Sequence, residues 1–305
     1  MRYEGMIYRP PSEAYSLIVQ VTIGCSQNHC IFCNMFKEKS FRIRKAKEVL
    51  EDLQDARNQY RHVEKIFLAD GDALVCKTQD LESILHFIQG KFPECRQVTL
   101  YGSPRSILMK DQEELDKLQR LGISMIYMGL ESGNDGVLAY MKKGVTAQEM
   151  IEAAHKVKKA GIRLSVTAIS GLGGRKLWKD HAKDTGLVLS EMKPDYIGLL
   201  TLMIEEGLPL ADKIRSGEFE LLNPYDILIE TKEMIKYLDC PGCLFRSNHA
   251  SNYVNLRGTL NQDKETMIHL LDEAIKGNIH MKSEWMRALY NGSNKVKERN
   301  YRNIL

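Results

Sequence analysis

Six short apolar runs alternate with amphipathic segments along most of this 305-residue chain, and this alternation limits what the chain can fold into. The runs are 17–23, 65–70, 98–102, 124–131, 162–169 and 196–202. They contain few polar residues, as strands buried on both faces require. Between the runs, apolar residues recur every three or four positions, as at Val49, Leu50 and Leu53, which predicts helices with one buried face. The pattern predicts parallel strands joined by right-handed helical crossovers.

Six such repeats favour an α/β fold, a partial (β/α)6 TIM-like barrel of parallel strands. An open, doubly wound sheet is the alternative. After Gly207 the alternation fades, and predicted helices over 225–238 and 263–276 indicate a C-terminal α-rich extension. We therefore predict an N-terminal extension (1–16), a core partial barrel (17–207) and a C-terminal extension (208–305) that closes the barrel mouth.

The composition narrows the class of protein. The 43 basic and 40 acidic residues give a net charge of +3, which supplies no global argument for binding nucleic acid. The seven cysteines are odd in number and clustered, unlike a secreted disulfide framework. No apolar run approaches the length that spans a bilayer, and the first sixteen residues lack the apolar core of a signal peptide. We expect a soluble, cytoplasmic protein with no membrane partner.

Three cysteines, Cys25, Cys30 and Cys33, lie within nine residues directly after the first apolar run. Thiolates suit iron–sulfur clusters and zinc. Three ligands on a cubane of four irons leave one iron open to another molecule, so the count favours a [4Fe–4S] cluster. The alternative is a structural zinc loop. Its fourth ligand would be His29, Cys240 or Cys243.

Unusual residues also follow each of the other apolar runs. In parallel α/β folds, ligands bind at the carboxyl ends of the strands, because the loops there vary without disturbing the core. The segments at these ends are 25–33, 70–72, 103–106, 131–133, 170–174 and 205–207, and they are rich in cysteine, carboxylates, hydroxyls and glycine. A single carboxylate after a strand is often only a helix cap. Six strand ends that all carry such residues together predict one active site.

On these residues the chain resembles the radical SAM superfamily, whose members bind S-adenosylmethionine (SAM) at the open iron of a [4Fe–4S] cluster. The commonest superfamily motif has three residues between its first two cysteines, whereas this chain has the variant C-x4-C-x2-C. Phe32, directly before the last cysteine, is a typical aromatic. The resemblance covers about 17–207. More narrowly, 9–14 and 248–253 are similar to a bacterial group near the oxygen-independent coproporphyrinogen oxidase-like and B12-associated branches.

The resemblance implies roles for individual residues. Cys25, Cys30 and Cys33 would each bind one iron, and the SAM methionine would chelate the fourth. The implied cofactor-binding residues are Phe32, Asp70, Gly71, Asp72, Glu131, Ser132, Ser170, Gly171 and Gly173. Residues 70–72 would accept hydrogen bonds from the SAM amino group, 131–132 would contact its ribose or methionine end, and 169–174 would lie along its adenine. The resemblance implies no catalytic residue beyond the cluster and SAM ligands.

The implied reaction is reductive cleavage of SAM to methionine and a 5′-deoxyadenosyl radical, which abstracts hydrogen from an unidentified, small-molecule substrate. A one-electron reductant such as flavodoxin or ferredoxin would be a partner. One alternative is a radical SAM enzyme that modifies RNA, and another is a non-enzymatic, zinc-stabilised module. Only the tail 295–305 and one basic run offer a surface for RNA, so nucleic acid is disfavoured. The run comprises Lys37, Lys39, Arg42, Arg44, Lys45 and Lys47.

The C-terminal extension supplies candidate substrate contacts in the polar stretch 246–253. They are Arg246, Asn248, His249 and Asn252. The same stretch also suits a polar loop that caps the following helix. Cys240 and Cys243 are compatible with an auxiliary cluster, a redox pair or an inert pair, and the last is favoured because too few further cysteines remain.

Overall fold

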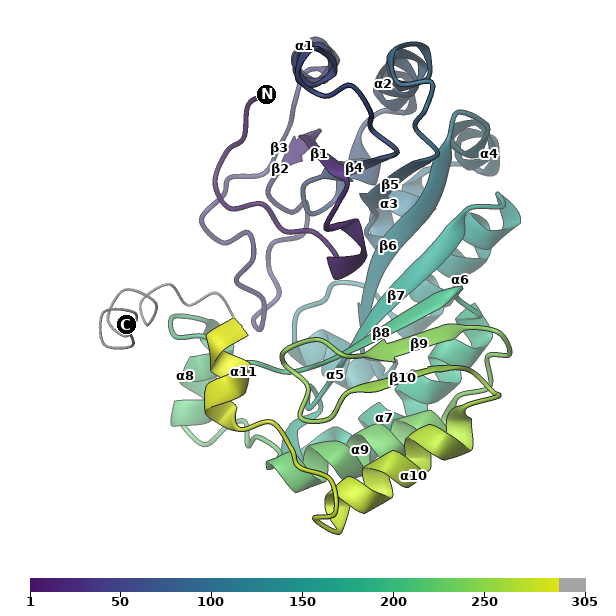
Figure 1. Cartoon of the computed structure of the whole chain (residues 1–305). Helices are drawn as coiled ribbons and strands as arrows, with labels where there is room; N and C mark the ends of the chain where they lie inside the picture. The colour runs from purple at the N-terminus through teal and green to yellow at the C-terminus, as the bar shows by residue number, and fades with distance from the viewer. Residues whose placement is uncertain (291–305) are drawn as a thin grey trace, which may run out of the picture. The chain divides into compact units, whose positions relative to one another are not determined.

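The computed structural model (Figure 1) describes residues 1–290. The chain forms two compact units. The first unit comprises Met1–Leu130 and Leu138–Val166. The second comprises Glu131–Val137 and 167–290. Each unit is described by itself.

The first unit is built on four parallel strands, β1 (Leu17–Gln20), β4 (Lys65–Ala69), β5 (Gln97–Tyr101) and β6 (Ile123–Glu131). Their register places Leu68 opposite Val19 on one side and Leu100 on the other, and Leu100 opposite Ile126. All four side chains are buried, because β-branched and leucine side chains fill a sheet covered on both faces. The predicted parallel strands are confirmed.

The first predicted strand, 17–23, is in fact two. β1 ends at Gln20, and the chain leaves the sheet so that β2 (Thr22–Ile23) pairs antiparallel with β3 (Arg42–Ile43). Val21 lies at the bend: its N–H donates to the carbonyl of Ala69, and its own carbonyl accepts from Arg44. This bend places the cysteine segment directly after β2.

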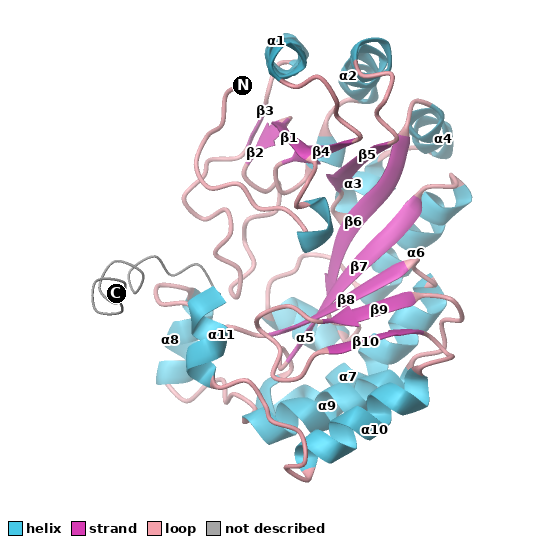
Figure 2. Cartoon of the chain, viewed as in Figure 1, coloured by secondary structure: helices cyan, strands magenta, loops and turns pink. Residues whose placement is uncertain are grey.

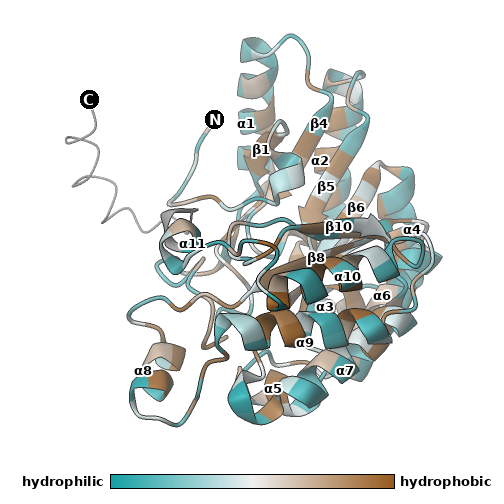
Figure 3. Cartoon of the chain, turned by 60° about the horizontal axis from the view of Figure 1, so that its bottom comes forward, coloured by the Kyte–Doolittle hydropathy of each residue, from teal (hydrophilic) through white to brown (hydrophobic). Residues whose placement is uncertain are grey.

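Helices cover one side of these strands, and Figure 2 shows α1, α2 and α4 side by side there. The helices of this unit are α1 (Ala46–Gln59), α2 (Thr78–Lys91), α3 (Pro104–Met109), α4 (Gln112–Arg120) and α6 (Ala147–Lys159), with two 3-10 turns, η1 (Pro11–Glu13) and η2 (Ala73–Val75). Asp111 and Thr146 begin α4 and α6 with reciprocal capping boxes. Figure 3 shows apolar residues concentrated on β4 and β5.

The second unit contains β8 (Tyr196–Thr201), which pairs parallel with β9 (Leu244–Ser247), and β9 pairs antiparallel with β10 (Leu256–Thr259). Its helices are α7 (Gly174–Met192), α8 (Pro209–Arg215), α9 (Pro224–Tyr237), α10 (Lys264–Ile275) and α11 (Glu284–Tyr290). α9 packs against both α7 and α10. The C-terminal extension, which the sequence predicts to be α-rich, therefore also contributes a β-hairpin.

Two elements cross the division between the units, β7 (Arg163–Ser170) and α5 (Asp135–Tyr140). The hydrogen-bonded strand order is β1-β4-β5-β6-β7-β8-β9-β10. The fold is thus of the α/β class with a mostly parallel sheet. Within residues 1–290, no helix combines the length and apolarity needed to cross a membrane.

Candidate active site

The cysteine segment follows β2 as a loop anchored by the rest of the first unit. The side-chain amide of Gln27 donates to the carbonyl of Lys143, and the Ile31 N–H donates to the carbonyl of Met141 at 3.2 Å. Asn28 Nδ2 donates to the carbonyl of Phe36 at 2.8 Å. These bonds fix the path of the loop on both sides of Cys30, so the four-residue gap lies in a loop that is hydrogen-bonded to the rest of the unit.

All three cysteines of this loop are half-buried, and none of the seven cysteines forms a disulfide. Among residues 1–290, no three histidine, cysteine or carboxylate side chains converge on a point where a single metal ion would bind. A cubane makes a different demand, because each of its three thiolates binds a separate iron. Three reduced, partly accessible thiols on one anchored loop fit that donor set.

Asp70 ties the start of this loop to the end of β4. Its side chain is fully buried, and its Oδ2 accepts from Lys39 Nζ at 2.7 Å, from the Gly24 N–H at 3.1 Å and from Gln20 Nε2 at 3.2 Å. Burial raises the pKa of Asp70, against the opposing effect of the Lys39 ammonium. Oδ1 is buried with no hydrogen-bond partner among the described residues. The predicted cofactor contact is thus also an internal anchor of the loop.

Asp72 is buried as well and joins three segments. Its Oδ1 accepts from the Ser103 N–H at 3.0 Å and from Ser106 Oγ at 2.7 Å. Its Oδ2 accepts from Ser103 Oγ at 2.8 Å and from Ser26 Oγ in the cysteine loop. Four donors saturate this carboxylate, and they hold the end of β4, the first turn of α3 and the loop together.

Gly71 lies between these carboxylates, against the cysteine loop. Its N–H donates to the Gly24 carbonyl at 3.1 Å. A Cβ at this position would lie 2.6 Å from the Phe36 ring and 3.0 Å from the Cβ of Cys25, so no larger residue fits. The backbone that follows β4 therefore lies against the loop at Cys25, the first of the three cysteines.

In the second unit, the segment after β6 is held by α7. Glu131 has a left-handed backbone (φ 65°), which is uncommon outside glycine. Ser132 is fully buried, and its Oγ lies 2.8 Å from His181 Nδ1. The Gly133 N–H donates to Thr185 Oγ1 at 2.9 Å. The predicted cofactor contact Ser132 thus faces the helix rather than solvent.

His181 also contacts the segment after β7. Its Nε2 lies 3.0 Å from the carbonyl of Ile169, which can only accept, so Nε2 carries the proton and Nδ1 accepts from Ser132 Oγ. Burial lowers the pKa of His181 to about 4, and the ring is neutral at neutral pH. One histidine therefore connects the two segments of this unit that the sequence assigns to SAM.

The glycine-rich segment 170–174 is fastened by α9. Ser170 Oγ lies 3.0 Å from Thr231 Oγ1, and the Gly171 N–H donates to Glu230 Oε2. Gly173 is buried at the start of α7. Sequence reasoning missed His181, Glu230 and Thr231. The available signal was polar residues at buried positions of otherwise apolar helix faces.

The four candidate substrate residues have different surroundings. Asn252 is buried, and its side chain accepts from Thr201 Oγ1 at 2.9 Å and donates to the Leu199 carbonyl at 2.8 Å, which fastens the β9–β10 connection to β8. His249 is half-buried with Nδ1 2.9 Å from Ser251 Oγ, and burial lowers its pKa. Arg246 and Asn248 are exposed. That these four residues contact the substrate stays a prediction.

Cys240 and Cys243 flank a tight turn in which the Cys243 N–H donates to the Cys240 carbonyl at 3.1 Å. Both are buried. The Cys240 N–H donates to Asn261 Oδ1 at 3.1 Å.

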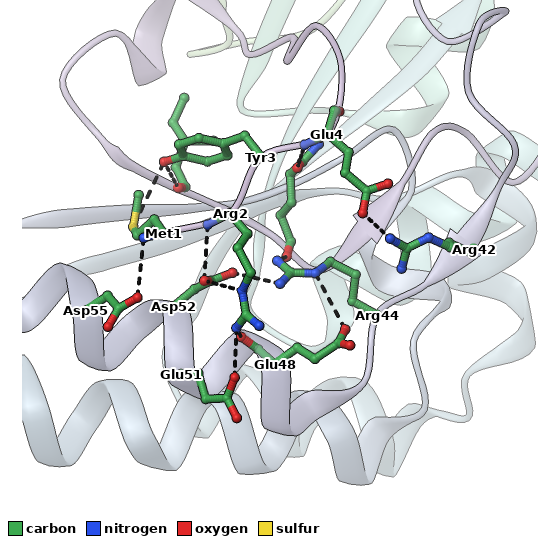
Figure 4. Close-up of polar contacts among 12 residues, drawn as sticks. Met1, Arg2, Tyr3, Glu4, Arg42, Arg44, Glu48, Glu51, Asp52 and Asp55 are labelled. Carbon is green, nitrogen blue, oxygen red and sulfur yellow. Dashed lines mark hydrogen bonds and ion pairs between the residues drawn. The ribbon is translucent and has the colours of Figure 1, made fainter.

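The basic run after the cysteine loop is largely used inside the first unit. Lys39 pairs with Asp70, and buried Arg44 pairs with Asp52 at 2.7 Å. Figure 4 shows that Asp52 also binds Arg2 of the N-terminal segment, at 2.9 Å. Burial acts to raise the pKa of Asp52, but the two guanidinium groups hold it below its ordinary value. These pairs hold the chain start against α1. The tail 295–305 lies outside the described residues.

We predict that His181→Leu lowers the free energy of unfolding by about 2–4 kcal/mol, because the buried Ser132 hydroxyl loses its acceptor and the Ile169 carbonyl loses the donor that His181 supplies. Urea unfolding measures this, with exposed His86→Leu as the matched control. Since the folded pKa is about 4 and the ordinary value 6.5, parent stability should fall as the pH drops from 6.5 toward 4. A variant that keeps this slope, or matches the parent at pH 7, contradicts the prediction.

Comparison with curated sequences finds only partial matches. The tRNA uridine(34) acetyltransferase of Methanocaldococcus jannaschii is 22% identical over 115 residues, which are 36% of this chain and 20% of that protein. The acetyltransferase of Methanocaldococcus infernus is 22% identical over 110 residues. The match thus spans about a fifth of the length of these relatives.

Solved structures share the fold. Coproporphyrinogen III oxidase from Escherichia coli, a radical SAM enzyme, superposes with a TM-score of 0.57 at 17% identity, covering 73% of this chain and 51% of that chain. The radical SAM methyltransferase TsrM from Kitasatospora setae gives 0.56 at 16% identity, covering 67% and 39%. The cobalamin-dependent radical SAM enzyme OxsB gives 0.52 at 19% identity, covering 87% and 36%. The chain therefore has their partial TIM-like barrel fold and spans about half of their length or less.

The sequence profile of the Radical SAM superfamily matches residues 19–184, more than half of the chain. Members of this family are enzymes that use a [4Fe–4S] cluster and SAM, and they need a one-electron reductant and a substrate. The matched region begins in β1 and ends within α7, so it includes the cysteine loop, both buried aspartates and the segments that His181 connects. This chain is a member of the radical SAM superfamily.

Proposed function

We propose that Cys25, Cys30 and Cys33 hold the [4Fe–4S] cluster and that the enzyme cleaves SAM reductively to abstract hydrogen from a small-molecule substrate. When bound, the cluster and SAM supply the electron transfer and the 5′-deoxyadenosyl radical. The observation that carries the proposal is the anchoring of the cysteine loop by Asp70 and Asp72 at the end of β4. Two buried carboxylates that fix one loop indicate a site whose geometry must be preserved.

The chain's own residues have distinct tasks in this proposal. Because Asp72 is saturated and Asp70 is engaged through Oδ2, the acceptors left for the SAM amino group are the backbone carbonyls of residues 70–72 and Asp70 Oδ1. Gly71 keeps that backbone close to Cys25. In the second unit, Glu131 and Ser132 serve the ribose or methionine end, and residues 170–174 serve the adenine. Flavodoxin or ferredoxin supplies the electron.

Anaerobic reconstitution with iron and sulfide tests the proposal. We expect about four irons per chain, the broad visible absorption of thiolate-bound clusters, and release of 5′-deoxyadenosine when dithionite and SAM are added. A protein that takes up only colourless zinc and releases no 5′-deoxyadenosine would rule out the proposal in favour of a zinc-stabilised module.

A second candidate substrate class is RNA. The match to two tRNA uridine(34) acetyltransferases and the fold shared with an archaeal Elp3 (TM-score 0.50, 13% identity) support it. The internal ion pairs of Lys39 and Arg44 weigh against it, because they remove two cations from the candidate RNA surface. Incubating the reduced enzyme with deuterated cell metabolites or with bulk tRNA separates the classes: deuterium transfer into 5′-deoxyadenosine from one pool identifies it.

A further inference from the structure

Glu230 is a buried carboxyl group that carries out no task in the mechanism above. It lies on α9, where Ile227, Leu228, Thr231 and Met234 are also buried, and none of its surface is exposed. Its Oε2 accepts from the Gly171 N–H, while its Oε1 has no hydrogen-bond partner among the described residues. No basic side chain of the described residues forms an ion pair with it. An unpaired carboxyl in such a place costs stability.

The protonation state of this carboxyl follows from its surroundings. Burial raises the pKa of Glu230 to about 8, and the Gly171 hydrogen bond opposes this only in part. The charged groups on the helices packed against α9 have partners other than Glu230. His181 and Asp184 of α7 bind the segment after β6, Arg175 of α7 pairs with Asp226, and Asp272 of α10 pairs with Lys232. Glu230 is therefore mostly neutral at pH 7.

The group that Glu230 holds is a peptide of the glycine-rich segment. Gly171 has a φ of +87°, and a Cβ there would lie 2.8 Å from Ile227 Cδ1, so α9 and the segment are in close contact. The neighbouring Ser170 hydroxyl meets Thr231, and the Ser170 carbonyl accepts from the Leu202 N–H at 2.9 Å. Among the described residues, Glu230 supplies the one side-chain hydrogen bond to the Gly171 peptide.

We propose that Glu230, in its neutral form, is a positioning residue for SAM: it holds the Gly171 peptide in the conformation that the adenine-binding segment requires. The inference rests on the proposed function, because that function assigns residues 170–174 to the adenine. A buried carboxyl group without an ion-pair partner lowers stability. Its presence here is explained if the site needs a hydrogen-bond acceptor that carries no charge. Ionisation leaves a buried charge with a single donor, which favours movement of the carboxyl and of Gly171.

The test is equilibrium binding of SAM to the reconstituted, unreduced enzyme by calorimetry, with iron content and melting temperature recorded for each variant. Glu230→Leu removes the acceptor and should weaken SAM binding about tenfold at pH 7. Glu230→Gln keeps an acceptor for Gly171 and should bind within about threefold of the parent. Glu233→Gln, on the same helix but outside this contact, is the control and should bind as the parent does.

The pH dependence separates positioning from bulk stability. From pH 7 to pH 9, parent affinity for SAM should fall about tenfold, and that of Glu230→Gln should not. Because the folded pKa is raised from 4.5, the stability linked to Glu230 is greatest below pH 4.5 and is lost as the pH rises through about 8. Glu230→Gln should therefore melt at a higher temperature than the parent at pH 8.

Three results would overturn the inference: Glu230→Leu binding SAM as the parent does, Glu230→Gln binding as weakly as Glu230→Leu, or Glu230→Gln keeping the parent's loss of affinity at pH 9. If Glu230→Leu does not fold, the pH comparison between the parent and Glu230→Gln decides. If the parent itself binds no SAM, the proposed function fails instead, and the melting curves still report whether Glu230 is neutral.

Discussion

Cys30→Ala will abolish cluster assembly, whereas Cys76→Ala will leave it intact. In the proposed site Cys30 is the middle ligand of the loop, and the hydrogen bond from the neighbouring Ile31 N–H to the Met141 carbonyl holds its position. A cluster bound by two thiolates is not retained in a protein that otherwise uses three. Iron and sulfide per chain, together with visible absorption after anaerobic desalting, measure the effect.

Cys76 is a matched control because it is a cysteine of the same unit with a different environment. It is buried before α2, and burial raises the pKa of its thiol to about 12, which keeps it protonated and unreactive. We expect its alanine variant to bind about four irons per chain, as the parent does. Equal loss of iron in both variants would show that the ligands are misassigned.

Asp72→Ala should destabilise the first unit by about 3–5 kcal/mol, the second large effect that the structure predicts. The substitution leaves the Ser103 N–H and three serine hydroxyls without the buried carboxylate that they share as acceptor. Urea unfolding gives the loss. Hydrogen exchange over residues 24–34 should report faster exchange, because Ser26 no longer ties the loop to β4.

Asp72→Asn provides the graded comparison, since it retains one acceptor oxygen and the serine hydroxyls can rotate to accept from the new amide. Its loss of stability should be less than half that of the alanine variant. Glu113→Gln, at an exposed position of α4, is the null control. An alanine variant as stable as the parent would mean that the four bonds to Asp72 contribute nothing to the fold.

The strand positions could be predicted because they depend on local pattern. Runs such as 65–70 and 98–102 are apolar throughout, and the structure confirms β4 and β5 within a residue or two. The hairpin of β9 and β10 was missed, because Leu244–Ser247 and Leu256–Thr259 are short and carry two arginines among few apolar residues. Such strands are stabilised by their neighbour β8 rather than by their own pattern.

The sequence predicted which segments carry the site's polar residues, but not which partners those residues bind. Asp70 and Asp72 were identified as residues of a strand end, yet nothing local to 70–72 indicates that Lys39 and Ser103 would engage them. His181 was missed for a related reason. A histidine in a helix reads as an ordinary core or surface residue until the strand ends that it contacts are known. A single sequence does not show which distant segments hydrogen-bond to each other.

The anchoring of the cysteine loop also constrains the order of events during synthesis. The loop at residues 25–33 is closed by Lys143 and Met141, more than a hundred residues downstream, in the segment that returns to the first unit after α5. A nascent chain that has emerged only through residue 130 therefore has the three thiols and the carboxylates that follow β4. It still lacks the carbonyls of Met141 and Lys143 that hold the loop. The loop can therefore take its final form only after Met141 and Lys143 have emerged.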